Sequence, residues 1–313
     1  MQGSRLGIVL LGAVLGTASL AAVGCGSDDS SSGAAVTGAT GSSSTPAQQT
    51  GGVSYDKTLA ASVPQAIRSK RTLNVATDAT YPPNEFIDKD GKTIVGLDAD
   101  LARDLGTILG LKLQLHNTPF DGIIPGLAAK KYDLGMSSFY ITEERKKVVD
   151  MVSYMASPTT LFAASDGGAN IASLADLCGK TVAVQKATTY ADDANAQSKK
   201  CKAAGKPGVK VSVFIDQNGA NLAIKSGRAD VGINDAGVAG YLVKQTNGQF
   251  KTLGKSYHPQ LIGLAVPRGN GLAKPLSDAF NKLMKSGAYA AALERWGSKE
   301  LGVQSSSVNP PVE

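Results

Sequence analysis

The sequence predicts an α/β protein whose two lobes are joined by a two-stranded hinge, and three observations lead to this fold class. Segments that alternate like strands and segments with the apolar spacing of helices follow each other along most of the chain, which is typical of layered α/β folds. The 313 residues exceed the usual size of a single core. Two extended segments, Thr159–Ala163 and Leu261–Val266, each leave one α/β unit and enter the other. Two such crossings let the lobes rotate without unfolding.

The first 24 residues have the composition of a targeting segment. Arg5 is their only charged residue, Leu6–Val23 is apolar, and Ala22-Val23-Gly24 precedes Cys25. This arrangement resembles a bacterial lipobox, which implies that residues 1–24 are a signal peptide and that Cys25 is lipidated. An uncleaved membrane anchor is the alternative. The following stretch is rich in Ser, Gly, Ala and Thr and cannot offset the entropy of ordering, so we expect residues 25–54 to be a flexible tether.

The first lobe is expected to begin with residues 55–160. Tyr55–Arg71 has helical spacing and Leu73–Thr77 alternates as a strand, which ends at Asp78 because Pro82-Pro83 cannot pair in a ladder. Further strands and helices follow in turn: a hairpin that turns at Gly91 and returns along Thr93–Gly96, a helix capped by Asp98 that ends at Gly110, a strand at Leu111–His116, a helix capped by Asp121, and a short buried strand at Tyr132–Met136.

The second lobe is expected to cover residues 161–261. Its segments alternate in the same way: a short helix at Leu174–Leu177, strands at Thr181–Val184, Val209–Phe214 and Asp230–Ile233, and helices from about Thr189 and through Leu222–Ser226. Residues 262–304 return to the first lobe with helices at Leu276–Met284 and Tyr289–Trp296. Residues 305–313, which contain Pro310-Pro311, are expected to be a frayed tail.

Besides Cys25, the sequence contains two cysteines, Cys178 and Cys201. An exported chain meets an oxidising environment, in which one such pair can close a surface loop. In the chain-entropy model this disulfide stabilises the fold by about 3 kcal/mol. Metal binding is less favoured because neither cysteine has a neighbouring Cys or His. We therefore expect a Cys178–Cys201 disulfide and neither a metal nor another cofactor.

The stretch Ser137–Arg145 lies at a strand-to-helix turn. Thr142 is placed to cap the helix, and Glu143 and Glu144 suit the positive end of its dipole. Arg145 in the same turn is electrostatically misplaced, by up to about 1 kcal/mol, unless an anion meets it. One interpretation is an ion pair with Glu143 or Glu144 on a solvated face. The other is that Arg145 binds an anionic ligand.

The run Ser-Ser-x-x-Ile-Thr-x-x-Arg, from Ser137 to Arg145, follows an Asp-x-x-Tyr-x-Pro segment (Asp78, Tyr81, Pro83) by about sixty residues. This combination resembles the signature of the family 3 extracellular solute-binding proteins, which are the polar amino-acid receptors of ABC importers. The resemblance covers roughly residues 70–301. It implies a type II periplasmic-binding-protein-like fold that captures a ligand between its lobes by hinge closure and catalyses no reaction.

The resemblance also assigns contacts to the ends of the ligand. Arg145 holds the ligand α-carboxylate, assisted by the backbone amides of Tyr140 and Thr189. Asp235 holds the α-ammonium with help from Ser138, although the cap of a following helix is the alternative role for Asp235. Tyr140 departs from the family pattern, in which Ser or Thr is common at this position.

Other residues are implied around the ligand side chain. Phe120 and Tyr81 match aromatic residues that sandwich it, with core packing as their alternative role, and Asp78 faces its end, with a turn position as its alternative. An acidic ligand is disfavoured there because two carboxylates repel in a desolvated pocket. The complete expected ligand set is Asp78, Tyr81, Phe120, Ser137, Ser138, Tyr140, Arg145, Gln185, Thr188, Thr189 and Asp235.

These features predict a lipid-anchored monomer on the extracytoplasmic face of a bacterial membrane. It would bind a polar or cationic L-amino acid, with glutamine, arginine, lysine and histidine as the leading candidates, and deliver it to a permease and ATPase complex. A cleft enzyme of the cyclohexadienyl dehydratase type and a ligand-sensing lobe without transport are the alternatives. The net charge of +6 is spread over the chain without a basic tract, so nucleic-acid binding is not expected.

Overall fold

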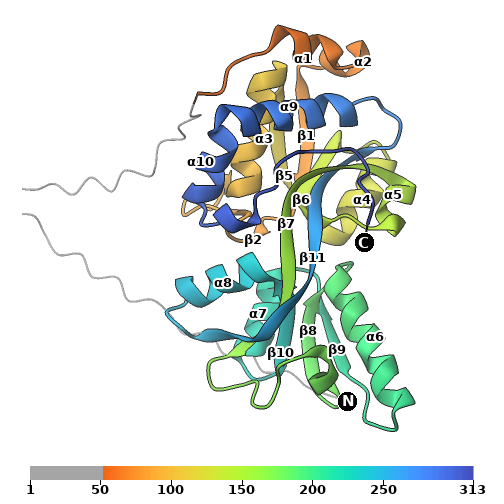
Figure 1. Cartoon of the computed structure of the whole chain (residues 1–313), viewed down its shortest axis with the longest axis vertical. Coiled ribbons are helices and arrows are strands. Elements are labelled where there is room, and N and C mark those ends of the chain that lie inside the picture. Colours follow the sequence, from red (N-terminus) through yellow and green to blue (C-terminus); the bar gives the residue numbers. More distant parts are fainter. Residues whose placement is uncertain (1–51, 313) are drawn as a thin grey trace, which may run out of the picture. The chain divides into compact units, whose positions relative to one another are not determined.

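One eight-stranded sheet runs through both lobes. The computed structural model describes residues 52–312, so the predicted signal peptide, Cys25 and nearly all of the predicted tether lie outside the described residues. The strand order is β5-β1-β6-β11-β7-β10-β8-β9, and its two long members are β7 (Val149–Ala164) and β11 (Phe250–Pro267). These two strands pair antiparallel and pass together from one lobe into the other (Figure 1). The predicted α/β fold with a two-stranded hinge is confirmed.

The pairing of β7 with β11 is irregular where the strands cross between the lobes. Thr159 pairs with Tyr257 and Ser157 with Gln260, and the register shifts on both sides of Tyr257. Fewer regular ladder bonds restrain the two strands at this point than within either lobe. The irregular segment is therefore where the strands can bend as a hinge.

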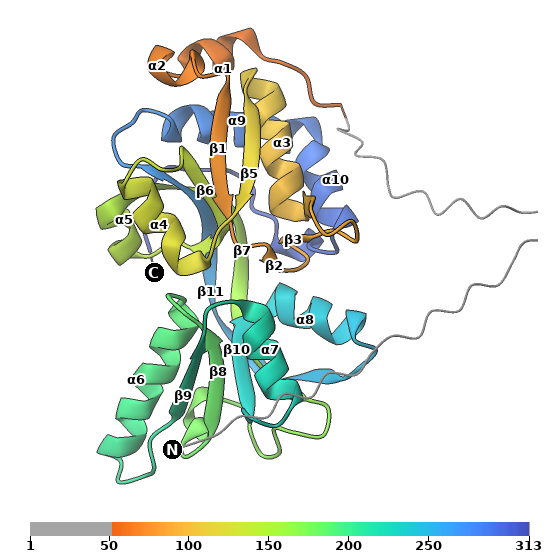
Figure 2. The ribbon, with the colours of Figure 1, turned by 180° about the vertical axis from the view of Figure 1, so that it is seen from behind.

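Lobe 1 contains β1 (Thr72–Thr77), which pairs parallel with both β5 (Lys112–Asn117) and β6 (Leu134–Tyr140). A separate small sheet lies at the end of this lobe that faces lobe 2 (Figure 2); it consists of β2 (Thr80–Tyr81), β3 (Glu85–Ile87) and β4 (Ile94–Val95). The helices of lobe 1 are α1 (Lys57–Ser62), α2 (Gln65–Arg68), α3 (Leu97–Leu109), α4 (Phe120–Ala128), α5 (Glu143–Val148), α9 (Ala273–Ser286), α10 (Ala288–Arg295) and a 3-10 turn at Lys299–Leu301.

Lobe 2 contains the other end of the sheet. Its strands are β8 (Thr181–Gln185), β9 (Lys210–Phe214) and β10 (Val231–Asp235), and its helices are α6 (Thr189–Ala203), α7 (Gln217–Lys225), α8 (Ala236–Gln245) and a 3-10 turn at Leu174–Leu177. The predicted disulfide is confirmed: Cys178 is bonded to Cys201 of α6, with 5.5 Å between their Cα atoms. Across residues 52–312, we find no helix with both the length and the hydrophobicity to cross a membrane.

The core of lobe 1 follows the predicted helical pattern. Leu101, Leu105 and Ile108 recur on one face of α3 and are all buried. They belong to one apolar cluster with Leu73 of β1 and Phe280 of α9. The spacing in the sequence thus decides which face of α3 packs against the sheet.

The start of α3 differs from the prediction, because Asp98 is not its cap. The helix begins after Gly96, which has φ 127° and approaches the backbone of Asn84 so closely that a Cβ atom would lie 2.2 Å from its carbonyl oxygen. Only glycine tolerates this combination. Asp98 therefore lies inside the first turn of α3, where its carboxylate is directed toward β6 and β7.

The start of α4 is also different. Pro119 precedes the helix, and Asp121 in its first turn makes an ion pair of 2.7 Å with Lys186 of lobe 2 instead of capping the helix. The predicted cap of α5 is confirmed, because the Oγ1 atom of Thr142 accepts a hydrogen bond of 3.2 Å from the backbone N–H of Arg145.

The prediction of a frayed tail is wrong for residues 305–312. β10 pairs with β7 only in the lobe-2 half of β7, from Thr159 to Phe162, so the lobe-1 half has an open edge. The tail lies along this edge: Gly302 forms a bridge to Met155 and Val308 forms one to Val152. Unpaired backbone groups of β7 thus order a polar segment that has little tendency to fold by itself.

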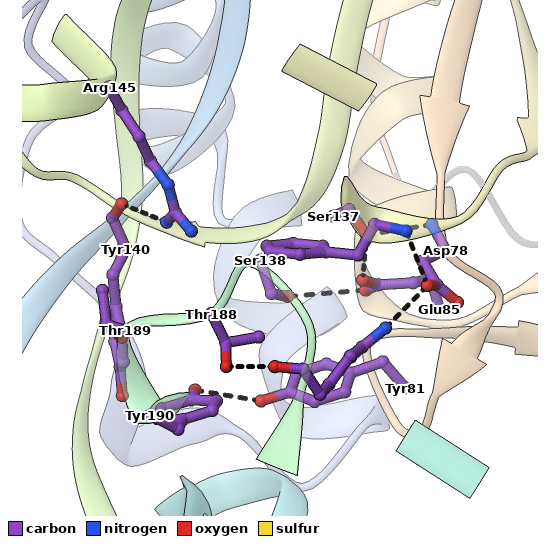
Figure 3. Close-up of a pocket in the computed structure, with 12 residues that line it drawn as sticks. Asp78, Tyr81, Glu85, Ser137, Ser138, Tyr140, Arg145, Thr188, Thr189 and Tyr190 are labelled. Carbon is purple, nitrogen blue, oxygen red and sulfur yellow. Dashed lines mark hydrogen bonds between the residues drawn. The ribbon is translucent and has the colours of Figure 1, made fainter. Parts of the chain in front are cut away.

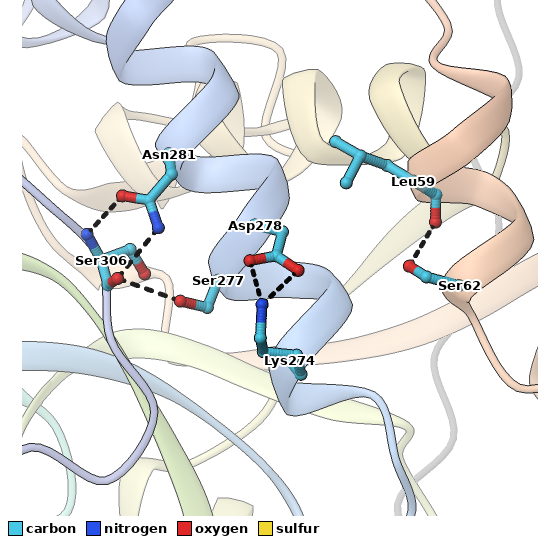
Figure 4. A network of polar contacts seen from close by, with 7 residues as sticks. All are labelled: Leu59, Ser62, Lys274, Ser277, Asp278, Asn281 and Ser306. Carbon is cyan, nitrogen blue, oxygen red and sulfur yellow. Dashed lines mark hydrogen bonds and ion pairs between the residues drawn. The ribbon is translucent and has the colours of Figure 1, made fainter.

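Side chains also fix this tail to lobe 1. Asn281 of α9 exchanges two hydrogen bonds with the backbone of Ser306, at 2.9 and 3.0 Å, and Ser277 donates a third to its carbonyl oxygen (Figure 4). Further along, Lys146 of α5 donates to the carbonyl oxygen of Pro310 at 2.9 Å. The tail is therefore attached to the helix that carries Arg145.

Candidate functional site

The expected ligand set meets in a cavity between the two lobes. Every member except Asp235 lines it, together with Glu85 and Tyr190, which the sequence analysis did not single out. Lobe 1 contributes the residue after β1, residues of β6 and of the small sheet, and residues in the first turns of α4 and α5, whereas lobe 2 contributes the end of β8 and the start of α6 (Figure 3). The lining consists of Asp78, Tyr81, Glu85, Phe120, Ser137, Ser138, Tyr140, Arg145, Gln185, Thr188, Thr189 and Tyr190.

The lobes are closed upon each other, and little free space remains between them. The centre of a water-sized sphere has a volume of only about 20 Å³ to occupy, which suffices for roughly one water molecule. Gln185 of lobe 2 donates to Asp78 of lobe 1 at 2.8 Å, and the Tyr81 hydroxyl bonds to both Asn234 and Tyr190. A larger guest therefore requires the lobes to open or these side chains to move.

Arg145 points from the first turn of α5 into the cavity. Its Nη1 donates to the carbonyl oxygen of Tyr140 at 2.7 Å and its Nη2 donates to that of Ala187 in lobe 2 at 3.1 Å. Its guanidinium also lies 5.5 and 5.3 Å from the ring centres of Phe120 and Phe139. Burial lowers the pKa of Arg145 to about 10. The guanidinium stays charged at neutral pH and is hydrogen-bonded to carbonyl oxygens.

The alternative ion pair of Arg145 with its neighbours in α5 is not formed within residues 52–312. Glu143 instead pairs with Lys146 at 2.7 Å on the outer side of the helix. Arg145 is therefore available to an anion that enters the cavity.

Asp78 lies at the end of β1 on the side of the cavity opposite Arg145 (Figure 3). Its carboxylate accepts hydrogen bonds from the Thr80 hydroxyl at 2.7 Å, from the backbone N–H of Phe120 at 2.9 Å and from Gln185. Burial raises the pKa of Asp78 above its usual value, although these donors oppose the shift. Two of the three donors belong to lobe 1, so the carboxylate stays oriented when lobe 2 moves away.

Glu85 of β3 adds a second carboxyl group to the same end of the cavity. It accepts a hydrogen bond of 2.8 Å from the Ser137 hydroxyl and lies against Asp98, which in turn accepts from Tyr154 at 2.8 Å and from the backbone N–H of Ser138 at 3.0 Å. Burial, and then the charge of Asp98, raise the pKa of Glu85 well above its usual value, and burial raises that of Asp98 to about 6. Burial thus disfavours a negative charge on both carboxyl groups at this end of the cavity.

Asp235 does not line the closed cavity. Its Oδ1 atom caps α8 by accepting from the backbone of Gly237 at 2.8 Å and also accepts from Ser157 at 2.8 Å. Its Oδ2 atom is buried and has no hydrogen-bond partner in the described chain. Burial raises the pKa of Asp235 to about 6. Asp235 is thus a helix cap, the alternative given above, and it keeps one carboxylate oxygen unused.

Three tyrosines that line the cavity lie within range of the charge of Asp235. Tyr81, Tyr140 and Tyr190 line the cavity, and the charge of Asp235 acts on all three and raises their pKa values together with burial. The rings of Tyr140 and Tyr190 meet edge to face, with 5.7 Å between their centres. The hydroxyl of Tyr140 is buried without a partner in the described chain, as is the amide nitrogen of Asn234. Several polar groups beside these tyrosines therefore lack a hydrogen-bond partner in the described chain.

The two residues that the sequence analysis missed differ in how they could have been found. Tyr190 directly follows Thr188 and Thr189, both of which the family resemblance indicates, in the first turn of α6. Glu85 lies in a hairpin, and its direction depends on how β3 pairs with β2 and β4. No pattern in the sequence fixes that pairing.

A second groove between the lobes contains Trp296, which follows α10. Its lining combines lobe-1 residues near Trp296 with residues of α8 in lobe 2, among them Tyr241 and Lys244. The indole Nε1 donates to Asp100 at 2.9 Å, and the ring meets Phe86 of β3 edge to face, with 5.7 Å between ring centres. Trp296 thus touches the strand that carries Glu85.

Comparisons with known proteins agree with this arrangement. The model of the "Bacterial extracellular solute-binding proteins, family 3" matches residues 73–299. The arginine-binding protein ArgT of Corynebacterium glutamicum is 30% identical over 243 residues, which are 77% of this chain and 79% of ArgT. An ancestral arginine-binding protein bound to arginine has 37% identity and a TM-score of 0.66, over 72% of this chain and 97% of that chain.

Another solved structure with a similar fold is an ancestral amino acid-binding protein that is a precursor of cyclohexadienyl dehydratase. It has 34% identity and a TM-score of 0.67, over 74% of this chain and 97% of that chain. The family model covers most of the described residues, and the sequence signature, the two-lobed fold and the relatives all agree. The chain therefore belongs to the bacterial extracellular solute-binding proteins of family 3.

Proposed function

We propose that this chain is the substrate-binding protein of an ABC importer and that it captures a cationic or polar L-amino acid, with arginine as the leading candidate. The distribution of charge in the cavity carries the proposal. Arg145 lies on one side, and the carboxyl groups of Asp78 and Glu85 lie on the other (Figure 3). A zwitterion with a positively charged side chain presents its carboxylate to Arg145 and its side-chain cation to Asp78 and Glu85.

The α-carboxylate is assigned to Arg145. The planar guanidinium can give a carboxylate two parallel N–H···O bonds in place of its present bonds to the carbonyl oxygens of Tyr140 and Ala187. The present bonds already have a charged donor, and a carboxylate acceptor adds the attraction of the opposite charge, which makes such bonds shorter and stronger. The exchange therefore favours the liganded state.

The α-ammonium is assigned to the unused Oδ2 atom of Asp235, assisted by the hydroxyl of Tyr140. Leaving such groups buried without a partner costs about 1 to 3 kcal/mol each, which an ammonium would offset. This contact requires Tyr140 or Tyr190 to move from its position in the closed cavity. The side of the cavity formed by Tyr81, Tyr140 and Tyr190 is therefore proposed as the ammonium subsite, which these rings cover in the closed cavity.

The side chain of the ligand is assigned to the space between Phe120 and Tyr81, with its end at Asp78 and Glu85. Phe120 is stacked on Phe139, with 4.7 Å between ring centres, which leaves its other face to the cavity. Aromatic rings favour a guanidinium or ammonium stem over an acidic one. The names of ArgT and of the ancestral arginine-binding protein support the same ligand class.

The remaining predictions about location and transport belong to this proposal. Lipidation at Cys25 with a tether over residues 25–54 would hold the monomer on the extracytoplasmic face of the membrane. Residues 55–160 with 262–304 would form one moving body and residues 161–261 the other. Closure around the ligand would present both to a permease and ATPase complex.

An enzymatic role is the second candidate, because one similar structure is a precursor of cyclohexadienyl dehydratase. Glu85 is a buried carboxyl group with a raised pKa that lines the cavity, which is the kind of group that transfers protons. Turnover of a cyclohexadienyl acid by the purified chain, abolished in Glu85→Gln, would favour this candidate over a receptor.

Isothermal titration calorimetry against the twenty common amino acids tests the proposed function. We expect L-arginine to bind at micromolar concentration or below, because two or three charge-assisted bonds supply most of the roughly 8 kcal/mol that this affinity requires. L-glutamate should give no heat. Absence of heat with every amino acid would overturn the proposal.

A further inference from the structure

Glu85 at the acidic end of the cavity lies against Asp98, which does not line the cavity, and the two carboxyl groups have too few donors around them to satisfy both as anions. Glu85 and Asp98 are 1% and 0% exposed. The hydroxyl of Ser138 lies 3.4 Å from the Oε2 atom of Glu85 and 3.3 Å from the Oδ2 atom of Asp98, so its single proton can serve only one of them. Two carboxylates so close in a desolvated site cannot both ionise at ordinary cost.

The groups around this pair do not balance its charge. Asp98 of α3 and Asp78 after β1 act on Glu85 as further negative charges. Tyr154 of β7 donates a hydrogen bond to Asp98, and the charge of Glu85 helps to raise the pKa of Tyr81 of β2. All of these groups are acidic or neutral. Burial raises the pKa of Glu85 well above its usual value and that of Asp98 to about 6, which favours a state in which the pair keeps one proton.

We propose that Glu85 selects a cationic ligand side chain and that the Glu85–Asp98 pair releases its proton when that side chain binds. This inference rests on the proposed function and specifies it further. The ligand cation replaces the proton as the partner of the pair, and the proton passes to the buffer while no other bond forms or breaks. A neutral side chain lacks the charge that expels the proton.

Calorimetry with two closely matched ligands measures this proton directly. L-Arginine and L-citrulline have nearly the same shape, but only arginine has a charged side chain. Each is titrated into the full chain at pH 7 in two buffers that differ in their enthalpy of ionisation. The dependence of the observed heat on the buffer gives the number of protons released. We expect up to about one proton for arginine and none for citrulline.

The affinity should depend on pH in the same way. Because the free site binds one more proton than the arginine complex, a higher pH favours the complex. We expect the affinity for arginine to rise by up to about tenfold per pH unit above about pH 6, until the free pair has lost its proton. The affinity for citrulline should stay nearly constant over the same range.

Two variants test whether the released proton comes from the Glu85–Asp98 pair or from another buried acid. Glu85→Gln keeps the shape and the acceptor for Ser137 but removes the charge. We expect it to lose at least about tenfold in affinity for arginine, more than it loses for citrulline, and all proton release. Asp104→Asn is the matched control. Asp104 is 7% exposed in α3 and has a pKa raised to about 6, but it does not line the cavity. We expect it to leave the proton count unchanged.

The outcomes distinguish this inference from the proposed function. If arginine binds without releasing a proton, or if citrulline releases as many, the inference is wrong and the receptor function stands. If no amino acid binds, the proposed function itself fails. Should Glu85→Gln fold poorly, the comparison of arginine with citrulline on the wild-type chain still decides the inference.

Discussion

The two ends of the cavity handle charge in different ways. At one end Arg145 keeps its charge at neutral pH and donates to two carbonyl oxygens. At the other end burial raises the pKa values of both Glu85 and Asp98, which favours a proton on the pair over two negative charges. A desolvated guanidinium cannot give up its proton at ordinary pH, whereas a desolvated carboxyl group can take one up.

This difference shows how the closed cavity can bury groups of both charges. Carbonyl dipoles and aromatic rings stabilise the buried charge of Arg145 at one end. A proton shared by Glu85 and Asp98 would reduce the negative charge at the other end. The ligand should then meet a fixed charge at one end and a titratable one at the other. Each of the following experiments changes one end and leaves the other in place.

The largest effect is expected from removing the fixed charge. Arg145→Ala eliminates two charge-assisted bonds to the ligand carboxylate, so the affinity for arginine should fall by about a hundredfold or more. Calorimetry measures the loss. Arg228→Ala is the control, because Arg228 is an exposed arginine of lobe 2 outside the cavity. Equal affinity of Arg145→Ala and the wild type would contradict the assignment of the carboxylate.

Asp235→Asn tests the ammonium subsite beside the fixed charge. Asparagine can still cap α8, so the free energy of unfolding should change by less than about 1 kcal/mol. The affinity for arginine should nevertheless fall by about tenfold to a hundredfold, because one charge-assisted bond is lost. Chemical denaturation and calorimetry on the same sample check both values. A stable variant with unchanged affinity would show that Asp235 is only a helix cap.

Glu85→Gln tests the titratable end through stability. Because the pKa of Glu85 is raised in the fold, the folded state keeps its proton to a higher pH than the unfolded chain does. The free energy of unfolding of the wild type should therefore fall as the pH rises from about 4.5, the ordinary value, through the raised pKa. The variant should be more stable by about 1 to 3 kcal/mol at pH 7.5 and nearly equal at pH 4.

Urea denaturation at these two pH values measures the difference. A variant that is less stable than the wild type at pH 7.5 would indicate that an ionised Glu85 stabilises the fold, which contradicts the expected effect of its raised pKa. The same measurement on Asp104→Asn shows how much of any gain comes from removing a buried acid elsewhere in α3.

The smallest effect is expected at the rim of the cavity. The ion pair between Lys186 and Asp121 joins the lobes, but the side chain of Lys186 is 59% exposed. Solvent screens such pairs, so Lys186→Ala should change the affinity by less than about fivefold, and less still at high salt. Titration at two salt concentrations checks this. A loss as large as that of Arg145→Ala would mean that the rim, and not the two ends, controls binding.

The sequence predicts the parts of the site that depend on local signals. The sequence places Ser137–Arg145 at a strand-to-helix turn with Thr142 as cap and a charged first turn, and the structure contains the cap and this first turn, although β6 extends to Tyr140. The same holds for the apolar face of α3. Spacing and side-chain chemistry are sufficient here, because neighbouring residues decide the outcome.

The sequence does not predict features that depend on distant segments. The direction of Glu85 follows from how β3 pairs, and the position of Asp98 follows from the close approach of Gly96 to Asn84. The tail is ordered by the open edge of β7, which no property of residues 302–312 indicates. Whether Asp235 reaches the cavity depends on where three tyrosines from both lobes stand.

The position of Trp296 has a practical consequence. It is the chain's single tryptophan, and it lies in a groove whose walls belong to different lobes. Its fluorescence emission therefore originates from one known place and should shift in wavelength when the separation of the walls, and hence the hydration of the indole, changes. Mixing experiments in a stopped-flow fluorimeter could follow closure in real time without an attached dye.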